Sequence, residues 1–167
     1  MEDKSKLMRY AAILGLYMGL FWALKYLCMI FGGKMELLGT LYVALTIIVP
    51  VIAYRFTLIY RARISGESFS FFHGWQFGVF LYTFAAIIVS LLHFFYYKNI
   101  LGAEGLSAIM RQSLSLLSEM VDPHVLEKVE LSPTPFQMTM QGMLNNILAG
   151  VVFSIPVALL TRKRNAE

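Results

Sequence analysis

The residues of this sequence that could do chemistry are a few polar side chains set inside long apolar stretches. In the last such stretch Gln137, Gln141 and Asn145 recur at four-residue steps, and Asn146 follows directly. A helix would therefore stack three amides on one face. Lys25 interrupts the first apolar stretch. Amide and ammonium groups are costly inside lipid, so each of them predicts a hydrogen-bonded contact between helices or a binding site.

Two interpretations of these polar residues are open. The amides either hydrogen-bond between helices, at about 0.6–2 kcal/mol per contact, or line a substrate pathway. Lys25 would lie about 9 Å from the outer end of its helix, so it either reaches the interface as an anchor or joins the amides. In the second case a polar pocket that opens to the outer side would contain Lys25, His93, Gln141, Asn145 and Asn146.

Residue patterns typical of enzymes are missing from the sequence. It contains no H-E-x-x-H motif, no phosphate-binding loop and no dinucleotide fingerprint. His73 and His93 would lie about 30 Å apart along one helix, which excludes a shared metal ion. The apolar stretches contain no Asp or Glu, so they lack the carboxylates that proton relays use. We therefore expect no catalytic residues, no metal site and no cofactor.

The elements that must position these side chains follow from a shortage of charge: 14% of the 167 residues are charged, against about 25% in soluble domains. An α-helix needs roughly 20 predominantly apolar residues to cross a bilayer. Four nearly uncharged stretches meet that length, near residues 10–31, 37–58, 71–96 and 136–160. The sequence therefore predicts an all-α protein, an integral membrane bundle of four transmembrane helices that forms a single membrane domain over 1–167.

The positions of the basic residues predict the orientation of these spans. Of the 14 Lys and Arg residues, nine fall on the side that holds both termini, four on the other side, and Lys25 within a span. Short cytoplasmic loops accumulate Lys and Arg, so both termini are expected in the cytoplasm. The first apolar stretch exceeds the roughly 7–15 residues of a signal-peptide core, and we expect it to remain as a span. The net charge of +4 then follows from topology and does not indicate nucleic-acid binding.

The stretch with ordinary charge density lies between the third and fourth spans, in the outer loop 98–135. Apolar residues there recur at three- and four-residue steps, which predicts an amphipathic extracytoplasmic helix over about 104–121. Asp122 and Pro123 end that helix and start a short second one through about residue 130. The amphipathic helix either lies along the outer interface or on the ends of the bundle, or acts as a lid or partner-binding element.

Two pairs of glycines predict close contacts between helices. Gly15 and Gly19 share one face of the first span, and Gly74 and Gly78 share one face of the third. Without side chains at these positions, the backbone of a neighbouring helix can approach closely. We expect the first and third spans to pack through these faces, either inside the monomer or across a dimer.

The order of these features resembles a known family. A basic start and a Gly-rich first span are followed by a short outer turn and by the segment Gly66-Glu-Ser-Phe-Ser-Phe-Phe-His-Gly74 at the third span. An outer helical segment with Asp122 and Pro123 precedes the fourth span and a basic tail. Over nearly its whole length the chain resembles a bacterial family of small four-span inner-membrane proteins, the domain of unknown function 4199. The resemblance implies an integral inner-membrane protein and brings no assigned activity and no catalytic residues.

These observations lead to two hypotheses about function. The first is a non-enzymatic membrane component, structural or accessory to a larger complex, because the spans are small and carry packing glycines. The alternative is a small oligomeric transport or permeation module with an outward-facing polar site. In either case we expect a multi-pass protein of the bacterial inner membrane, whose partners are the lipid bilayer and copies of itself or other membrane proteins, and not nucleic acid.

Overall fold

The computed structural model describes residues 2–32, 35–64, 69–117 and 133–162, and within these ranges the chain forms helices and no strands. Four helices are long and apolar enough to cross a membrane: α1 (Glu2–Gly32), α2 (Glu36–Arg63), α3 (Phe71–Tyr96) and α6 (Pro135–Thr161). The predicted all-α class and its four spanning helices are confirmed, and the chain is a multi-pass membrane protein. Two helices, α1 and α2, continue beyond the predicted spans, because polar residues can extend a helix past the hydrocarbon.

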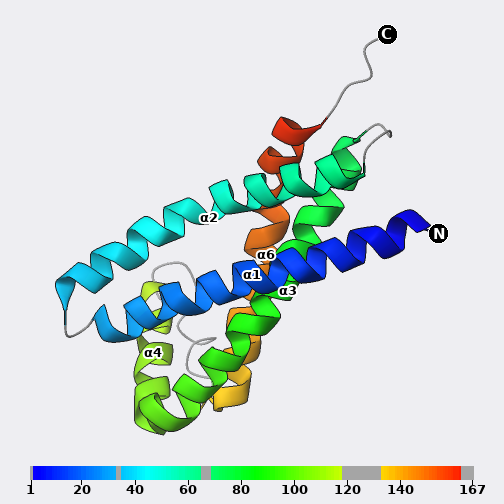
Figure 1. Cartoon of the computed structure of the whole chain (residues 1–167). Helices are drawn as coiled ribbons and strands as arrows, with labels where there is room; N and C mark the ends of the chain where they lie inside the picture. Colours follow the sequence, from blue (N-terminus) through cyan, green and yellow to red (C-terminus); the bar gives the residue numbers. More distant parts are fainter. Residues whose placement is uncertain (1, 33–34, 65–68, 118–132, 163–167) are drawn as a thin grey trace. The chain divides into compact units, whose positions relative to one another are not determined.

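The chain divides into two compact units, Met1–Val89 with Leu144–Glu167, and Ser90–Met143. The first unit contains α1, α2, the first part of α3 and the second part of α6. Within it α1 (blue) and α2 (cyan) run in opposite directions (Figure 1). The N–H of Met35, just before α2, donates to the carbonyl of Gly32 at the end of α1, at 3.3 Å.

Glycines bring α1 close to α3. A methyl group at Gly15 would lie 2.6 Å from Cβ of Phe84, and one at Gly19 would lie 2.7 Å from Cβ of Ile88. Carbon atoms in ordinary contact are about 3.5–4.0 Å apart, so neither position has room for a side chain. The face of α1 that carries these glycines therefore packs directly on α3.

The same device joins α3 to α6. A methyl group at Gly74 would lie 3.6 Å from Cα of Ala158, in ordinary contact, and one at Gly78 would overlap the side chain of Ser154. Both neighbours are buried residues of α6. In this structure the glycine faces of α1 and α3 make their close contacts within one chain.

An aromatic cluster joins α2 to α3. Tyr60 is fully buried; its ring stacks on Phe77 with centres 4.3 Å apart, and on His73 at 5.6 Å. A hydrogen bond of 2.7 Å links the Tyr60 hydroxyl to Nε2 of His73. One residue further along α2, a guanidinium N–H of Arg61 donates to the carbonyl of Thr161 at the end of α6, at 2.7 Å. The second half of α2 is thus tied to both α3 and α6.

The second unit contains, after the end of α3, a feature that the sequence did not reveal. A π-helical turn, Tyr97–Leu101, follows α3, and α4 (Gly102–Leu117) follows the turn. Gly102 has φ 67° and ψ −177°, a conformation open almost exclusively to glycine. Its N–H donates to the carbonyl of Tyr97. Glycine at this position therefore allows the chain to leave the π turn and start α4.

Helix α4 matches the predicted amphipathic helix as far as Leu117. Leu106 is buried, whereas Glu104, Arg111 and Gln112 are exposed. The remainder of the predicted helix, Asp122 with Pro123, and the predicted short second helix lie outside the described residues.

Candidate functional site

A small cavity, open on one side, lies between the helices of the first unit. Its volume is about 160 Å³, and residues of α1, α2, α3 and α6 line it. Pro50 and Tyr82 lie near the middle of their helices, which places the cavity at membrane depth. The lining residues are Trp22, Lys25, Thr46, Val49, Pro50, Tyr82, Asn146, Ala149 and Phe153.

Lys25 brings a positive charge to this cavity. Its side chain is half-buried, and Nζ lies 5.9 Å from the centre of the Trp22 ring and 5.1 Å from that of Tyr42. A cation over an aromatic face is attracted to the ring by about 0.5–2 kcal/mol, more strongly where water is excluded. The two rings belong to α1 and α2, so the ammonium is held between these helices at the side of the cavity.

Two further polar groups belong to the walls of the cavity. Trp22 is 6% exposed and Tyr82 is 2% exposed, and their rings meet edge to face with centres 5.7 Å apart. Neither Nε1 of Trp22 nor the Tyr82 hydroxyl hydrogen-bonds another described residue. A buried donor without a partner costs roughly 1–3 kcal/mol. Both atoms have less than 1 Å² of accessible surface, so an acceptor in the cavity reaches them only when the two rings shift.

The predicted polar residues of the first unit separate into two environments. Asn146 lines the cavity together with Lys25. Asn145, one residue earlier, is exposed on the outside of α6. Successive residues of a helix point about 100° apart, so only one of two neighbouring amides can face the same space.

The other two predicted polar residues, His93 and Gln141, belong to the second unit. The His93 side chain is buried, and its ring centre lies 6.0 Å from that of Tyr97. A methyl group at Gly142 would lie 3.6 Å from Nδ1 of this histidine, which is ordinary contact. Gln141 is exposed. His93 therefore packs against α6 inside its own unit.

Gln137, the first amide of the predicted stripe, has a local role. Its side-chain oxygen accepts hydrogen bonds from the backbone N–H of Thr134, at 2.8 Å, and from the Thr134 hydroxyl, at 3.0 Å. In return the Thr134 hydroxyl accepts the N–H of Gln137, at 3.2 Å. This reciprocal pair is a capping box, which satisfies the free N–H groups at the start of a helix. Gln137 thus defines where α6 begins.

The outer face of α6 carries a regular line of exposed residues, which we term the α6 seam. It begins at Asn145 and repeats at alternating steps of three and four residues. Such steps are the spacing by which one helix packs along another in a left-handed pair. The seam consists of Asn145, Leu148, Val152, Ile155 and Leu159, all of which are exposed.

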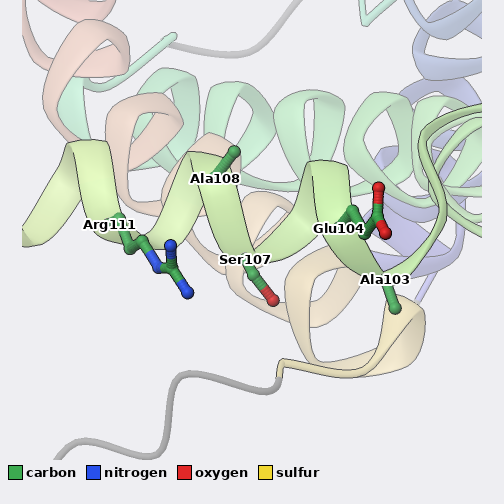
Figure 2. A pocket seen from close by; sticks show the side chains of 5 residues that line it. All are labelled: Ala103, Glu104, Ser107, Ala108 and Arg111. Atoms are coloured by element: carbon green, nitrogen blue, oxygen red, sulfur yellow. The ribbon is translucent and has the colours of Figure 1, made fainter.

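An open hollow of about 520 Å³ lies against the polar face of α4, which supplies its described lining residues (Figure 2). It is lined by Ala103, Glu104, Ser107, Ala108 and Arg111, and Figure 2 shows the side chains of Ser107 and Arg111 on the same side of the helix. One acid, one base and one hydroxyl on an exposed helix are typical of a solvated surface. Across the described part of the chain, no three His, Cys, Asp or Glu side chains come together as a metal ion would need.

Sequence reasoning missed Trp22 and Tyr82. Trp22 precedes Lys25 by three residues, a spacing that places both on one helix face, so it could have been grouped with the lysine. Tyr82 lies on another helix, and nothing in its local sequence indicates that its hydroxyl is buried beside Trp22.

Comparisons with known proteins identify a family for this chain. The model of a family described as "Protein of unknown function (DUF4199)" matches residues 13–163, which is most of the 167-residue chain. The family resemblance of the sequence is therefore confirmed. No curated protein and no solved structure matches the chain.

Proposed function

We propose that this chain, which belongs to the DUF4199 family, is a non-enzymatic structural or accessory component of a larger membrane assembly. The observation that supports this proposal is the α6 seam. It places the exposed amide of Asn145 at the start of an apolar line of residues, on a helix that is long and apolar enough to span a membrane. Lipid offers such an amide no hydrogen-bond partner, whereas a neighbouring helix does. The seam is therefore proposed to contact a helix of another chain.

The partner that fits the seam best is α6 of a second copy. The seam runs from Asn145 to Leu159, which is 14 residues or about 21 Å of helix. In parallel helix pairs with this spacing, an Asn in the apolar line pairs with the same residue of the partner and fixes the register. Two copies of the seam would bring Asn145 beside Asn145, and apolar side chains would meet along the rest of the contact.

The association can be measured on the full chain in liposomes, by energy transfer between labelled copies at increasing protein density. We expect a dimer, and we expect Asn145→Leu to weaken it by about 0.6–2 kcal/mol, or roughly 3- to 30-fold. Asn99→Leu is a matched control, because Asn99 is also exposed but its amide donates to the carbonyl of Phe95, four residues earlier in the chain, at 3.1 Å. A protein that stays monomeric at every density, or a dimer unchanged by Asn145→Leu, would contradict the proposal.

The proposal includes a location, the bacterial inner membrane with both termini in the cytoplasm. It is supported by the excess of Lys and Arg at the termini and in the last part of α2. With the basic residues explained by topology, no nucleic-acid partner is proposed. Fusions at Arg63 and Glu167 should activate a cytoplasmic reporter, and a fusion at Glu104 should activate a periplasmic one. Activity of a periplasmic reporter at Glu167 would contradict this orientation.

A small oligomeric transport or permeation module is the second candidate, and the cavity beside Lys25 and Asn146 favours it. Efflux of chloride or inorganic phosphate from proteoliposomes would test this candidate. Flux that depends on the protein and is lost in Lys25→Met would favour transport over an accessory role. Equal leakage from vesicles with and without the protein would exclude permeation of these ions.

A further inference from the structure

We infer that the cavity beside Lys25 is a binding site for the anionic head of a single-chain amphiphile, a carboxylate or a phosphate, whose chain follows a groove between α2 and α6. The inference does not depend on the association through α6 that we propose above, because the site lies within one chain.

The polar groups of the cavity walls are mainly hydrogen-bond donors. The Lys25 ammonium and the Trp22 indole can only donate, and the Tyr82 hydroxyl can donate as well as accept. The polar atoms of Trp22 and Tyr82 are buried and have no partner among the described residues. The hydroxyl of Thr46, in contrast, is already bonded to the carbonyl of Tyr42, at 2.8 Å. Asn146 adds an amide that can donate and accept, so a ligand that fits the whole set offers mainly acceptors.

The charge of the cavity favours an anion. The four predicted spans contain no Asp or Glu, so no carboxylate of this chain at membrane depth can pair with Lys25. The two aromatic rings beside Nζ hold the ammonium in place but do not neutralise it. A negatively charged group brought by a ligand would do so, with charge-assisted hydrogen bonds that are stronger than neutral ones.

The size of the cavity limits the head group. A volume of about 160 Å³ is close to that of an engineered protein cavity of roughly 150 Å³ that binds benzene. One carboxylate or phosphate with the first carbons of its chain fits this space.

An apolar groove continues from the cavity. A second hollow of about 310 Å³ lies between α2 and α6, and Pro50 lines both spaces. From Asn146 to Leu160 the two spaces follow α6 for 14 residues, or about 21 Å. Val51 and Leu160 are exposed, so a chain could enter from the lipid. The other residues that line this groove are Tyr54, Pro156 and Val157.

The test is binding of radiolabelled palmitate to the full chain in nanodiscs of phosphatidylcholine. We expect saturable binding that unlabelled palmitate or hexadecyl phosphate displaces, and the stronger competitor identifies the preferred acid. Hexadecanol, which has the same chain without the charge, should compete at least about tenfold less well, since it forms no charge-assisted hydrogen bond.

Two sets of variants separate the head site from the groove. Lys25→Met should weaken palmitate binding at least about tenfold, and Lys25→Arg should retain most of it, because the charge and the donors remain. Lys98→Met is the matched control, since Lys98 also lies over an aromatic ring, with Nζ 5.8 Å from the centre of Phe94. In the groove, Val51→Trp should block the alkyl chain of palmitate and weaken its binding. Val43→Trp is the control, because Val43 does not line the groove but is as exposed as Val51, at 57% and 56%. It should leave palmitate binding unchanged.

Several results would overturn the inference. If the Lys25→Met variant kept the original thermal stability and bound palmitate as well as the original protein, Lys25 would not belong to the binding site. If hexadecanol competed as well as palmitate, the ligand would merely partition into an apolar groove, and the charged head group would not be recognised. If acetate or inorganic phosphate displaced palmitate as effectively as hexadecyl phosphate, the site would bind a free anion, and the alkyl chain would contribute nothing to binding.

Discussion

The contact between α1 and α3 predicts the effect of one added methyl group. In Gly15→Ala the new Cβ would lie 2.6 Å from Cβ of Phe84 and 3.0 Å from the carbonyl oxygen of Leu81. Neither neighbour is the end of a flexible side chain. Carbon atoms in contact lie about 3.5–4.0 Å apart, so α1 must move about 1 Å away from α3 at this crossing.

The magnitude follows from two opposing effects. Excess volume in a well-packed interior costs typically about 1–3 kcal/mol. Alanine is the better helix former by about 1 kcal/mol, which offsets part of that cost. Gly39→Ala provides the reference, because a methyl group at Gly39 would meet nothing within 4 Å and its helix α2 would gain the propensity alone. We expect Gly15→Ala to be less stable than Gly39→Ala by about 1–3 kcal/mol.

The assay is reversible unfolding of the purified protein in mixed micelles by sodium dodecyl sulfate, followed by circular dichroism. The difference between the two free energies of unfolding cancels errors in the extrapolation. If Gly15→Ala unfolded at the same detergent fraction as Gly39→Ala, or at a higher one, the direct backbone contact between α1 and α3 would be wrong.

Three further predictions concern side-chain hydrogen bonds. Thr134→Ala and Gln137→Ala should each lower the free energy of unfolding by about 1 kcal/mol. Because the two side chains form one capping box, the double variant should lose less than the sum of the two single losses. A double-mutant cycle of unfolding free energies measures this, and strict additivity would contradict the prediction. Tyr60→Phe should lower the free energy of unfolding by about 1 kcal/mol, since the Tyr60 hydroxyl hydrogen-bonds His73. An unchanged stability in the detergent titration would show that this hydrogen bond does not contribute. Trp75→Phe should lose a similar amount, because its indole N–H donates to a carbonyl of α6 at 3.1 Å, and hydrogen exchange should show whether α6 opens more often.

The helices themselves could be predicted because crossing a bilayer requires only a simple property of the sequence. A span must be long and nearly uncharged, and gaps between charged residues show this directly. The glycine pairs also indicated faces suited to close packing. What the pattern could not supply was the partner of each face: Gly15 and Gly19 meet α3, whereas Gly78 meets Ser154 of α6. A partner depends on which helices are neighbours in space, and the local sequence does not contain that information.

The cavity could be predicted less well than the helices. Lys25 and Asn146 were recognised as costly groups in lipid, but the stripe of amides does not act as one unit in the structure. Gln137 caps its own helix, and Asn145 is exposed. The rotation of α6 about its axis decides which amide faces the cavity, and packing against α3 sets that rotation through residues such as Ser154. The capping box of Thr134 and Gln137, in contrast, is a local pattern that the sequence contains in full.

The most direct test of the proposed association is disulfide cross-linking at two adjacent leucines of α6, in a Cys28→Ser background. Leu159 belongs to the α6 seam and is 48% exposed, whereas Leu160 points away from the seam and is 73% exposed. Pairing through the seam predicts that Leu159→Cys forms cross-linked dimers in native membranes and Leu160→Cys does not, and that Asn145→Leu reduces the Leu159→Cys cross-link. Cross-linking that follows exposure, with Leu160→Cys ahead of Leu159→Cys, or no cross-link at either position, would contradict the account.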